Sequence, residues 1–276
     1  MFGPRSVNPF IEKNAKKRHD AIRTFPLNSV SRDRHVRVII NFHFVLIKKL
    51  QNVIMRDALL FDIDGTLLYA RGVGRAAFGA AFLAAYGRPY PDVGNLCFVG
   101  ATDSNVVRMM AASCGIISTP AKEEHFFLRL AHDIDAALAQ NAPLVFPGVP
   151  ELISRLNGHG HALGIITGNV RATAWSKLRH AGLDHAFIFG AYGDEHHERS
   201  AIAALAITRV LSDATVRILI GDTPLDVQAA HANGLKAVAV ATGWVTAEEL
   251  AAAGADLVVS DFSDTERSIA QLEALF

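Results

Sequence analysis

Two aspartates one residue apart are the first feature of the sequence that suggests chemistry. Asp62 and Asp64 follow a short apolar run, residues 58–61, and Gly65 comes next. The run is typical of a buried strand, and the glycine favours a turn at its end. Two carboxylates at one strand end repel each other unless a cation lies between them. Because Asp64 and Gly65 are also ordinary turn residues, other parts of the chain must distinguish a cation site from a turn.

A second acidic pair follows another apolar run, residues 217–220. Asp222 is expected where this strand ends, and Asp226 lies one helical turn later, so that both side chains can face the same place. Four carboxylates then gather at the ends of two strands. Carboxylate oxygens favour hard cations, Mg²⁺ above all. The sequence therefore predicts a magnesium site, with these candidates: Asp62, Asp64, Asp222 and Asp226.

Two further segments offer groups that could bind an anion. Thr167, Gly168 and Asn169 follow the apolar run 161–166 and precede a predicted helix. A hydroxyl and a permissive backbone at a helix N-terminus form a cradle for a phosphate, although the same tripeptide is a common turn. Arg199 opens another predicted helix and is suited to neutralise a phosphate or the crowded carboxylates. The alternative for Arg199 is a surface salt bridge with an acidic neighbour.

These residues can meet only if the strands before them lie side by side in one sheet. From residue 148 onward, short apolar runs alternate with segments of helical spacing. This alternation predicts a Rossmann-like α/β core, in which helices cover both faces of a parallel sheet. Ligands of such sheets bind outside the carboxyl ends of the strands, where the candidate residues fall. The expected strands are 58–61, 161–166, 187–189, 217–220, 237–240 and 257–259, and the expected helices are 150–156, 171–181, 199–211, 224–233, 246–252 and a last one from 265.

Residues 69–147 interrupt this alternation with helical segments. Helices are expected at 71–86, about 102–115 and 120–140, from their apolar spacing, an N-cap at Thr102 and a first-turn proline at Pro120. We interpret the segment as a helical cap inserted into a core formed by 55–68 and 148–276. Its position after the first strand suits a lid that excludes water from a site. The alternative is an ordinary helical layer of a single domain.

The first 54 residues differ from the rest of the chain in charge. The net charge of the chain is zero, yet residues 1–56 hold 12 lysines and arginines against 3 acidic residues. Their most apolar part, 36–47, is too short and too polar to span a bilayer, and it lacks the features of a secretory signal. A targeting segment or a nucleic-acid arm would fit the charge, but neither shows a specific motif. We expect a basic extension that is poorly ordered or not native, with Met55 as an alternative start.

Two cysteines bear on the cellular compartment. Cys97 and Cys114 lack the spacing of a metal or redox site and are expected to be small core residues. They indicate a reducing compartment, so we expect a cytoplasmic protein.

In their order and spacing, four segments resemble the motifs of the haloacid dehalogenase-like (HAD) hydrolase superfamily. The resemblance extends from residue 57 to about 262, and the segments are Phe61–Thr66, Ile166–Asn169, Arg199 and Gly221–Asp226. Two shorter segments, Gly100–Asp103 and Ala241–Gly243, favour the phosphoglycolate phosphatase-like branch. One departure concerns the third motif, which usually carries a lysine. Arg199 matches this position here, and Lys177 is the less favoured alternative because it lies in the middle of a helix.

The resemblance implies a phosphomonoester hydrolase with a helical cap domain. Asp62 would be the nucleophile that forms an aspartyl-phosphate, and Asp64 would be the general acid and base. Mg²⁺ would be held by the Asp62 carboxylate, the Asp64 main-chain carbonyl and Asp222, with help from Asp226.

The resemblance also implies how the substrate is bound. The phosphoryl group would be bound by Thr167, Gly168, Asn169 and Arg199. In the cap, Arg71 and Asp103 would face the substrate. The expected partner is a small phosphorylated metabolite, with no nucleic acid and no membrane, and the protein would be a monomer or a homodimer.

Several alternatives share parts of this pattern. A dehalogenase would not need Asp64, and a phosphonoacetaldehyde hydrolase needs a lysine early in the cap, whereas residues 57–121 contain none. A sugar-phosphate mutase or phosphotransferase stays open because it would share every core residue named above. A non-catalytic binding module is the alternative from another class, and the presence of all four aspartates disfavours it.

Overall fold

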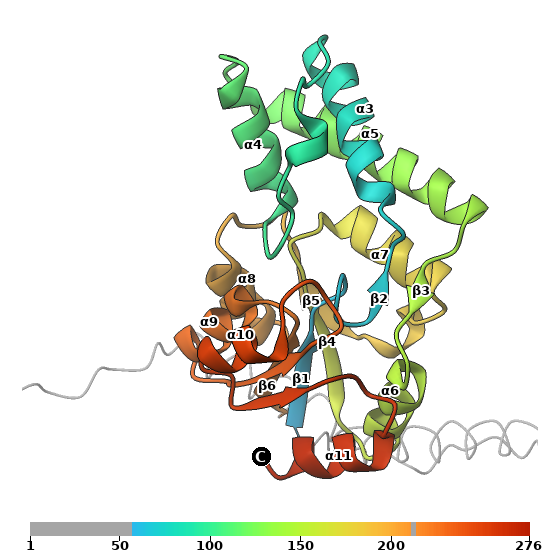
Figure 1. The fold of residues 1–276 in the computed structure, drawn as a ribbon, viewed down its shortest axis with the longest axis vertical. Coiled ribbons are helices and arrows are strands. Elements are labelled where there is room, and N and C mark those ends of the chain that lie inside the picture. The colour runs from blue at the N-terminus through green and yellow to red at the C-terminus, as the bar shows by residue number, and fades with distance from the viewer. Residues whose placement is uncertain (1–56, 211–213) are drawn as a thin grey trace, which may run out of the picture. The chain divides into compact units, whose positions relative to one another are not determined.

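The computed structural model describes residues 57–210 and 214–276 (Figure 1). The expectations for the first 54 residues lie outside the described residues. The described chain contains a six-stranded sheet in the order β5-β4-β1-β6-β7-β8, and all neighbouring strands in it are parallel. The strands are β1 (Asp57–Phe61), β4 (Ala162–Ile166), β5 (Phe189–Ala191), β6 (Thr215–Gly221), β7 (Lys236–Val240) and β8 (Leu257–Val259). Because β4 and β6 flank β1, residues that follow these three strands meet at one edge.

The sheet is covered on both faces because the side chains of β1 alternate between two apolar clusters. Leu59 and Phe61 belong to one buried cluster, whereas Ala58 and Leu60 belong to the other. The face of Ala58 and Leu60 is covered by α8 (Arg199–Thr208), α9 (Pro224–Ala232) and α10 (Ala247–Ala252). The other face is covered by α6 (Val149–Gly158), α7 (Arg171–His180) and α11 (Thr265–Glu273). The predicted Rossmann-like α/β core is confirmed.

Three further helices form a layer beyond the carboxyl edge of the sheet, at the top of Figure 1. They are α3 (Val73–Tyr86), α4 (Asp103–Ser113) and α5 (Pro120–Gln140), and together with the short helix Val93–Asn95 we call them the helical unit. Aromatic packing holds the unit together. The ring centroids of Phe78 and Phe126 lie 5.3 Å apart, and those of Phe82 and Tyr86 lie 4.5 Å apart. The unit therefore has an apolar interior, and its buried residues belong to the same cluster as Leu59 and Phe61 of β1.

The chain enters and leaves the helical unit through two short strands, β2 (Leu68–Tyr69) and β3 (Leu144–Val145), which pair antiparallel. The sequence analysis expected no strand here, because a strand of two residues has no apolar periodicity to detect. Arg71 reinforces the pair: its Nε donates a hydrogen bond to the Ala142 carbonyl at 3.0 Å. The incoming and outgoing segments of the unit are thus side by side.

One strand of the core is displaced from its expected place. The sequence analysis predicted residues 187–189, whereas β5 is Phe189–Ala191. Phe187 is buried in the apolar cluster of α6 and α7, and Ile188 is exposed. The strand then continues through two small residues that the apolar pattern does not reveal. A Cβ on Gly164 of β4 would lie 2.5 Å from the Phe189 ring, so the glycine gives that ring its place in the sheet.

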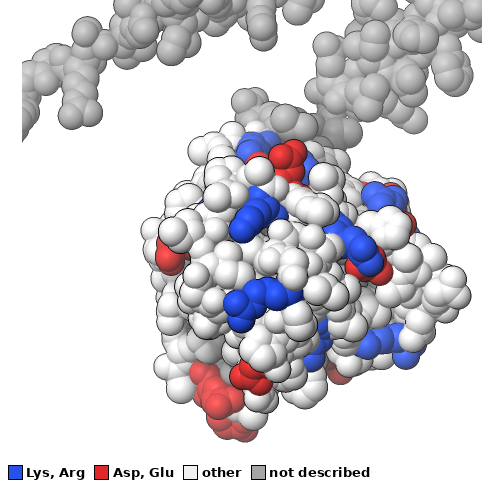
Figure 2. All heavy atoms as spheres, turned by 90° about the horizontal axis from the view of Figure 1, so that it is seen from above, with Lys and Arg blue, Asp and Glu red and all other residues white. Residues whose placement is uncertain are grey.

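The outer face of the molecule shows mixed charges. Seen from above, lysines and arginines are separated from one another by uncharged surface, with acidic groups between them (Figure 2). In residues 57–210 and 214–276, no helix has both the length and the apolar character needed to cross a bilayer.

Candidate active site

Three of the four predicted carboxylates lie together at the carboxyl edge of the sheet. Asp62 follows β1, and its amide donates to the Ile220 carbonyl of β6 at 2.9 Å, which brings the two strand ends together. Asp222 follows β6, and Asp226 lies in the first turn of α9. Each of the three offers an oxygen within 4.8 Å of the others, and all three residues are buried. Among the described residues, this group is suited to hold a metal ion.

Glycines allow the backbone to close around this cluster. Gly65 has a φ of 82°, a left-handed conformation that favours glycine. A Cβ on Gly65 or on Gly243 would overlap the Asp222 carboxylate, and one on Gly221 would overlap Asp226. The carboxylates are thus closely surrounded by main chain that follows β1, ends β6 and follows β7, which fixes their positions.

Arg199 is the counter-charge of the cluster. From the first turn of α8, its Nη2 lies 2.9 Å from Asp62 Oδ1 and 2.5 Å from Asp226 Oδ1, and its Nε donates to Asp226 Oδ1 at 2.6 Å. The side chain is buried. The alternative of a surface salt bridge is therefore wrong for Arg199. Its acidic neighbour Glu195 instead pairs with Arg209 at 2.7 Å.

Asp226 is largely committed to protein contacts. Its Oδ2 accepts from the Thr223 amide at 3.1 Å, a bond of the capping box that begins α9, and it also accepts from the Thr223 hydroxyl at 2.7 Å. Its Oδ1 faces Arg199. Asp62 and Asp222 are therefore the better placed pair for direct contact with a cation, and Asp226 is better placed to orient the site.

The electrostatics of the cluster show what a cation would contribute. Burial raises the pKa of Asp62 to about 6; Arg199 opposes this rise, and Asp226 and Asp64 add to it. Burial, followed by repulsion from Asp62 and Asp226, raises the pKa of Asp222 to about 8. Three carboxylates share a single guanidinium, so the site has excess negative charge when ionised. Buried oxygen donors with excess negative charge fit Mg²⁺.

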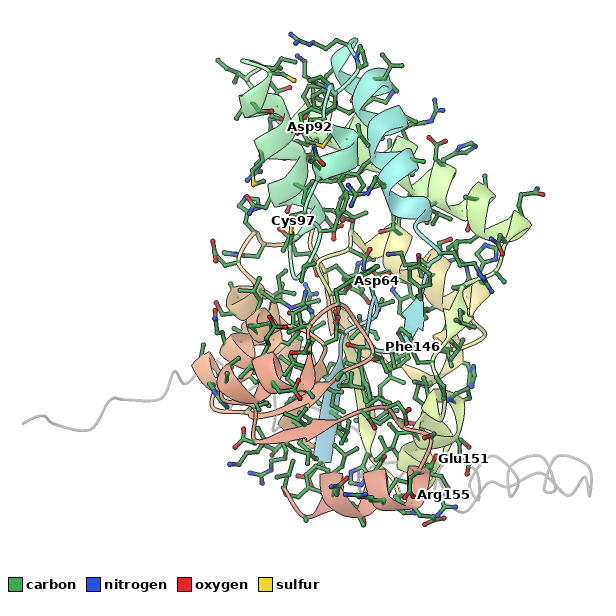
Figure 3. All side chains as sticks on the ribbon, in the orientation of Figure 1. Asp64, Asp92, Cys97, Phe146, Glu151 and Arg155 are labelled. Carbon is green, nitrogen blue, oxygen red and sulfur yellow. The ribbon has the colours of Figure 1, made fainter. Side chains whose placement is uncertain are left out.

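Asp64 lies apart from this cluster and belongs to a second one, between the sheet and the helical unit (Figure 3). Its Oδ2 accepts from Lys177 Nζ at 2.6 Å and from Asn169 Nδ2 at 2.7 Å. Lys177 Nζ also donates to Asn169 Oδ1 at 2.7 Å, and Asn169 Nδ2 donates to the Thr167 hydroxyl at 2.7 Å. The structure thus separates the two aspartates of the first motif into different environments.

Lys177, the less favoured alternative to Arg199 in the sequence, lies in this second cluster. Its position in the middle of α7 argued against a role, yet its side chain is buried and reaches the carboxyl edge of the sheet. The signal that could have found it is its spacing: Lys177 lies on the same stripe of α7 as the buried Ala174 and Leu178. A lysine on an apolar helix stripe requires a partner for its charge, and Asp64, which is partly exposed, is that partner.

Two residues of the predicted cap, Arg71 and Asp103, were expected to face the substrate. Arg71 is exposed and donates to Ala142 beside the short strands, as described above. Asp103 is buried, and its Oδ2 accepts from the Val170 amide at 2.9 Å. The structure therefore brings Asp103 to the loop of Thr167–Asn169, whereas the contact of Arg71 is with the segment that leaves the helical unit.

The sequence of this fold and site matches a known family. The family model described as haloacid dehalogenase-like hydrolase matches residues 59–240, which is more than half of the chain. The chain belongs to the haloacid dehalogenase-like hydrolase family. The predicted family is thus confirmed, and the matched range contains all four HAD motifs.

Individual HAD proteins resemble this chain over most of their length. Probable phosphatase IndB of Dickeya dadantii is 30% identical over 218 residues, which cover 76% of this chain and 92% of the relative. Phosphoglycolate phosphatase of Synechococcus elongatus is 28% identical over 217 residues, which cover 78% of this chain and 98% of the relative. The crystal structure of CbbY from Rhodobacter sphaeroides in complex with phosphate superposes with a TM-score of 0.60 at 22% identity, covering 76% of this chain and 96% of that one. The last comparison supports the fold.

Metal binding should stabilise this HAD protein most at alkaline pH. Because the pKa values of Asp62 and Asp222 are raised to about 6 and about 8, the folded metal-free chain holds protons that the unfolded chain releases near pH 4. The free energy of unfolding therefore falls as the pH rises from about 4 to about 8. Mg²⁺ offsets the repulsion, so saturating MgCl₂ should raise the melting temperature by about 5 °C at pH 8 and much less at pH 5.

Thermal unfolding with MgCl₂ or EDTA at the two pH values measures this effect. Asp222→Asn is the matched variant, since it keeps the size of the side chain and removes one charge. It should show little response to Mg²⁺. A magnesium shift of equal size at pH 5 and pH 8 would contradict the assignment of these carboxylates to the metal site.

Lys177→Met should reduce kcat about 100-fold, because the ammonium that holds Asp64 is lost while the apolar stem is kept. The folded state should remain, since Asp64 keeps its bond to Asn169 and is partly exposed. Lys236→Met is the control: this exposed lysine pairs with Asp256 at 2.7 Å and begins β7 at the opposite edge of the sheet. Steady-state kinetics of both variants decide the matter, and full kcat in Lys177→Met would remove Lys177 from the active site.

Proposed function

We propose that this protein is a Mg²⁺-dependent phosphomonoester hydrolase that acts through an aspartyl-phosphate on a small phosphorylated metabolite, as phosphoglycolate phosphatases do. The observation that carries the proposal is the difference in surroundings between two aspartates. Asp62 is buried beside Asp222 and Arg199, whereas Asp64 lies in the cluster of Lys177 and Asn169. The guanidinium beside Asp62 supports a role for this carboxylate at the phosphoryl group, and the separate surroundings of Asp64 support a role in proton exchange.

In the first step, an Asp62 carboxylate oxygen attacks the phosphorus and forms an oxygen–phosphorus bond, while the bond to the leaving oxygen breaks. Asp64 gives its proton to that leaving oxygen. In the second step, Asp64 takes a proton from water as the water oxygen attacks the same phosphorus. The bond to Asp62 breaks, inorganic phosphate is released, and both side chains return to their starting state.

The surrounding residues supply positioning and charge. Arg199 holds Asp62 in place from one side and contributes positive charge where the phosphoryl group collects negative charge. The Thr167 hydroxyl and the loop at Gly168 and Asn169 are suited to bind phosphoryl oxygens. Mg²⁺, held by Asp62, the Asp64 carbonyl and Asp222, would neutralise the charge on the phosphoryl oxygens.

The experiment that tests the proposal is phosphate release by the purified full chain, with MgCl₂ or with EDTA. An aryl phosphate serves as the general substrate, and a panel of phosphoglycolate, sugar phosphates and nucleoside monophosphates ranks the leaving groups. We expect release that requires Mg²⁺, with the highest kcat/KM on a small metabolite.

A cytoplasmic location and a monomeric or homodimeric state are further parts of the proposal.

The opposite result also has a clear meaning. If a folded, Mg²⁺-binding protein releases no phosphate from any substrate, the hydrolase proposal is wrong. Transfer of the phosphoryl group to a sugar hydroxyl would then be measured next, because a mutase would use the same core residues. Absence of both reactions would leave a binding module.

A further inference from the structure

The phosphate-binding loop that follows β4 is enclosed by main chain on two sides. On one side, the Asp103 amide donates to the Gly168 carbonyl at 2.8 Å. On the other side, the Gly193 amide donates to the Asn169 carbonyl at 2.8 Å. A Cβ on Gly168 would overlap the Ala101 carbonyl, and one on Gly193 would overlap the Gly168 carbonyl. The loop is therefore in direct backbone contact with the N-terminus of α4, which belongs to the helical unit.

The side chain of Asp103 adds a second bond to the same loop. It is 8% exposed, and its Oδ2 accepts from the amide of Val170, the residue that precedes α7. In a capping box, the amide of the residue before the helix donates instead to a side chain in the first turn of that same helix. No side chain of α7 accepts a bond from the Val170 amide, and the carboxyl group of Asp103, from another part of the chain, is the acceptor.

We propose that Asp103 is a positioning residue for the phosphate-binding loop, so that the loop takes its working geometry only when α4 is docked against it. Asp103 acts through the loop rather than on the reacting atoms. The inference rests on the proposed function, since it assigns the loop to the phosphoryl group of the substrate. It differs from the expectation that Asp103 faces the substrate directly.

The position of the loop explains why this bond matters for chemistry. Gly168 and Val170, which Asp103 binds, are the two neighbours of Asn169. The side-chain Nδ2 of Asn169 donates a hydrogen bond to Asp64 Oδ2 and another to the Thr167 hydroxyl, each at 2.7 Å. A shift of the backbone at Val170 would therefore move the phosphoryl-binding hydroxyl and the proton-exchanging carboxylate together. Errors of this kind are costly because catalysis depends on near-ideal placement of the reacting groups.

The chemistry of the bond suggests a conservative replacement. Burial raises the pKa of Asp103 to about 7, and Lys177 and the Val170 amide oppose this rise. Both the charged and the neutral carboxyl group retain an oxygen that accepts a hydrogen bond. The amide oxygen of asparagine can accept the same bond, whereas alanine leaves the Val170 amide without a partner.

A matched control is available one residue further along α4. Ser104 is also buried, and its hydroxyl donates to the Gly193 carbonyl on the far side of the loop. Ser104→Ala therefore removes a docking contact of the same helical turn without touching Val170. It separates a specific effect on the loop from a general weakening of the contact between α4 and the core.

The experiment uses the full chain and the variants Asp103→Ala, Asp103→Asn and Ser104→Ala. Hydrogen exchange of the Val170 amide is followed by NMR, and binding of inorganic phosphate in the presence of MgCl₂ is followed by calorimetry. In Asp103→Ala we expect about tenfold faster exchange and about tenfold weaker phosphate binding, since a buried donor loses its partner. Asp103→Asn should stay within about threefold of the unmodified chain in both measurements, because the acceptor is kept. Ser104→Ala should do the same.

Each contrary result overturns the proposal. If exchange at Val170 is unchanged in a folded Asp103→Ala variant, the bond does not hold the loop. If Ser104→Ala loses as much phosphate binding as Asp103→Ala, the effect comes from general docking of α4 and not from Asp103. If Asp103→Ala does not fold, Asp103→Asn still decides, because weak phosphate binding in that folded variant contradicts the proposal. If the unmodified chain binds no phosphate at all, the proposed function fails, whereas the exchange of Val170 still reports on the contact itself.

Discussion

Asp62→Asn should reduce the rate of phosphate release about a thousandfold or more and leave the protein folded. This is the largest effect that we expect. The amide nitrogen and oxygen of asparagine have nearly the shape of the carboxylate but are poor nucleophiles, so no aspartyl-phosphate can form. The change also removes one of three crowded carboxylates. Since burial and like charges raise the pKa of Asp62, the variant should be at least as stable as the unmodified chain in the absence of metal.

The control for this prediction comes from the same strand. Asp57 is the first residue of β1, at the opposite end from Asp62, and its carboxylate pairs with Arg217 at 3.1 Å. Asp57→Asn should keep full activity. Phosphate release and thermal unfolding are measured for both variants. If a folded Asp62→Asn retained a tenth of the activity, the nucleophile would have to be another group.

Arg199→Ala should lower the free energy of unfolding by about 3–5 kcal/mol, because it leaves two buried carboxylates without their counter-charge. Both Asp62 and Asp226 lie within 2.9 Å of its Nη2. Activity should be lost as well, since Arg199 holds the proposed nucleophile in place. Arg199→Lys keeps the charge but loses the planar fork that bridges the two carboxylates. We expect it to recover most of the stability and part of the activity.

Urea unfolding without metal measures these differences, and α8 offers a control at its other end. Arg209 follows the last residue of the helix and pairs with Glu195 at 2.7 Å on a partly exposed surface. Arg209→Ala should cost about 1 kcal/mol or less, as is usual for exposed pairs. Arg199→Ala with a cost no greater than that of Arg209→Ala would mean that Arg199 does not balance the charge of the site.

Several elements could be predicted because the signals that specify them are local. The first-turn proline Pro120 predicted a helix at about 120–140, and the structure has α5 at Pro120–Gln140, with the Thr119 hydroxyl accepting from the Lys122 amide. The aspartates of the site could be predicted for a related reason. Asp62 and Asp222 each follow a strand directly, Asp226 lies one helical turn after Asp222, and the carboxyl ends of parallel strands share one edge.

Other parts could not be predicted because they depend on packing between distant segments. Lys177 was only the less favoured alternative to Arg199 in the sequence, and its contact with Asp64 depends on how the buried stripe of α7 packs at the carboxyl edge of the sheet. Asp103 lies at the start of a helix, where an acidic residue is common and local spacing says nothing about its partner. Its contact with Val170 exists because α4 packs against a loop that lies 67 residues away in the chain.

The pairing of β2 with β3 bears on how such a chain can diversify. Leu68 pairs with Val145, so the two ends of the long segment between β2 and β3 lie one strand spacing apart. The sheet therefore closes in the same register, Ala58 opposite Ala162, whatever the length of the segment between them. Since loop-closure entropy grows only slowly with length, the segment between β2 and β3 can be shortened, lengthened or exchanged without disturbing the register of the sheet, as long as it keeps a group that holds the loop after β4 as Asp103 does. An ancestral core could thus acquire new substrates by replacing this one segment.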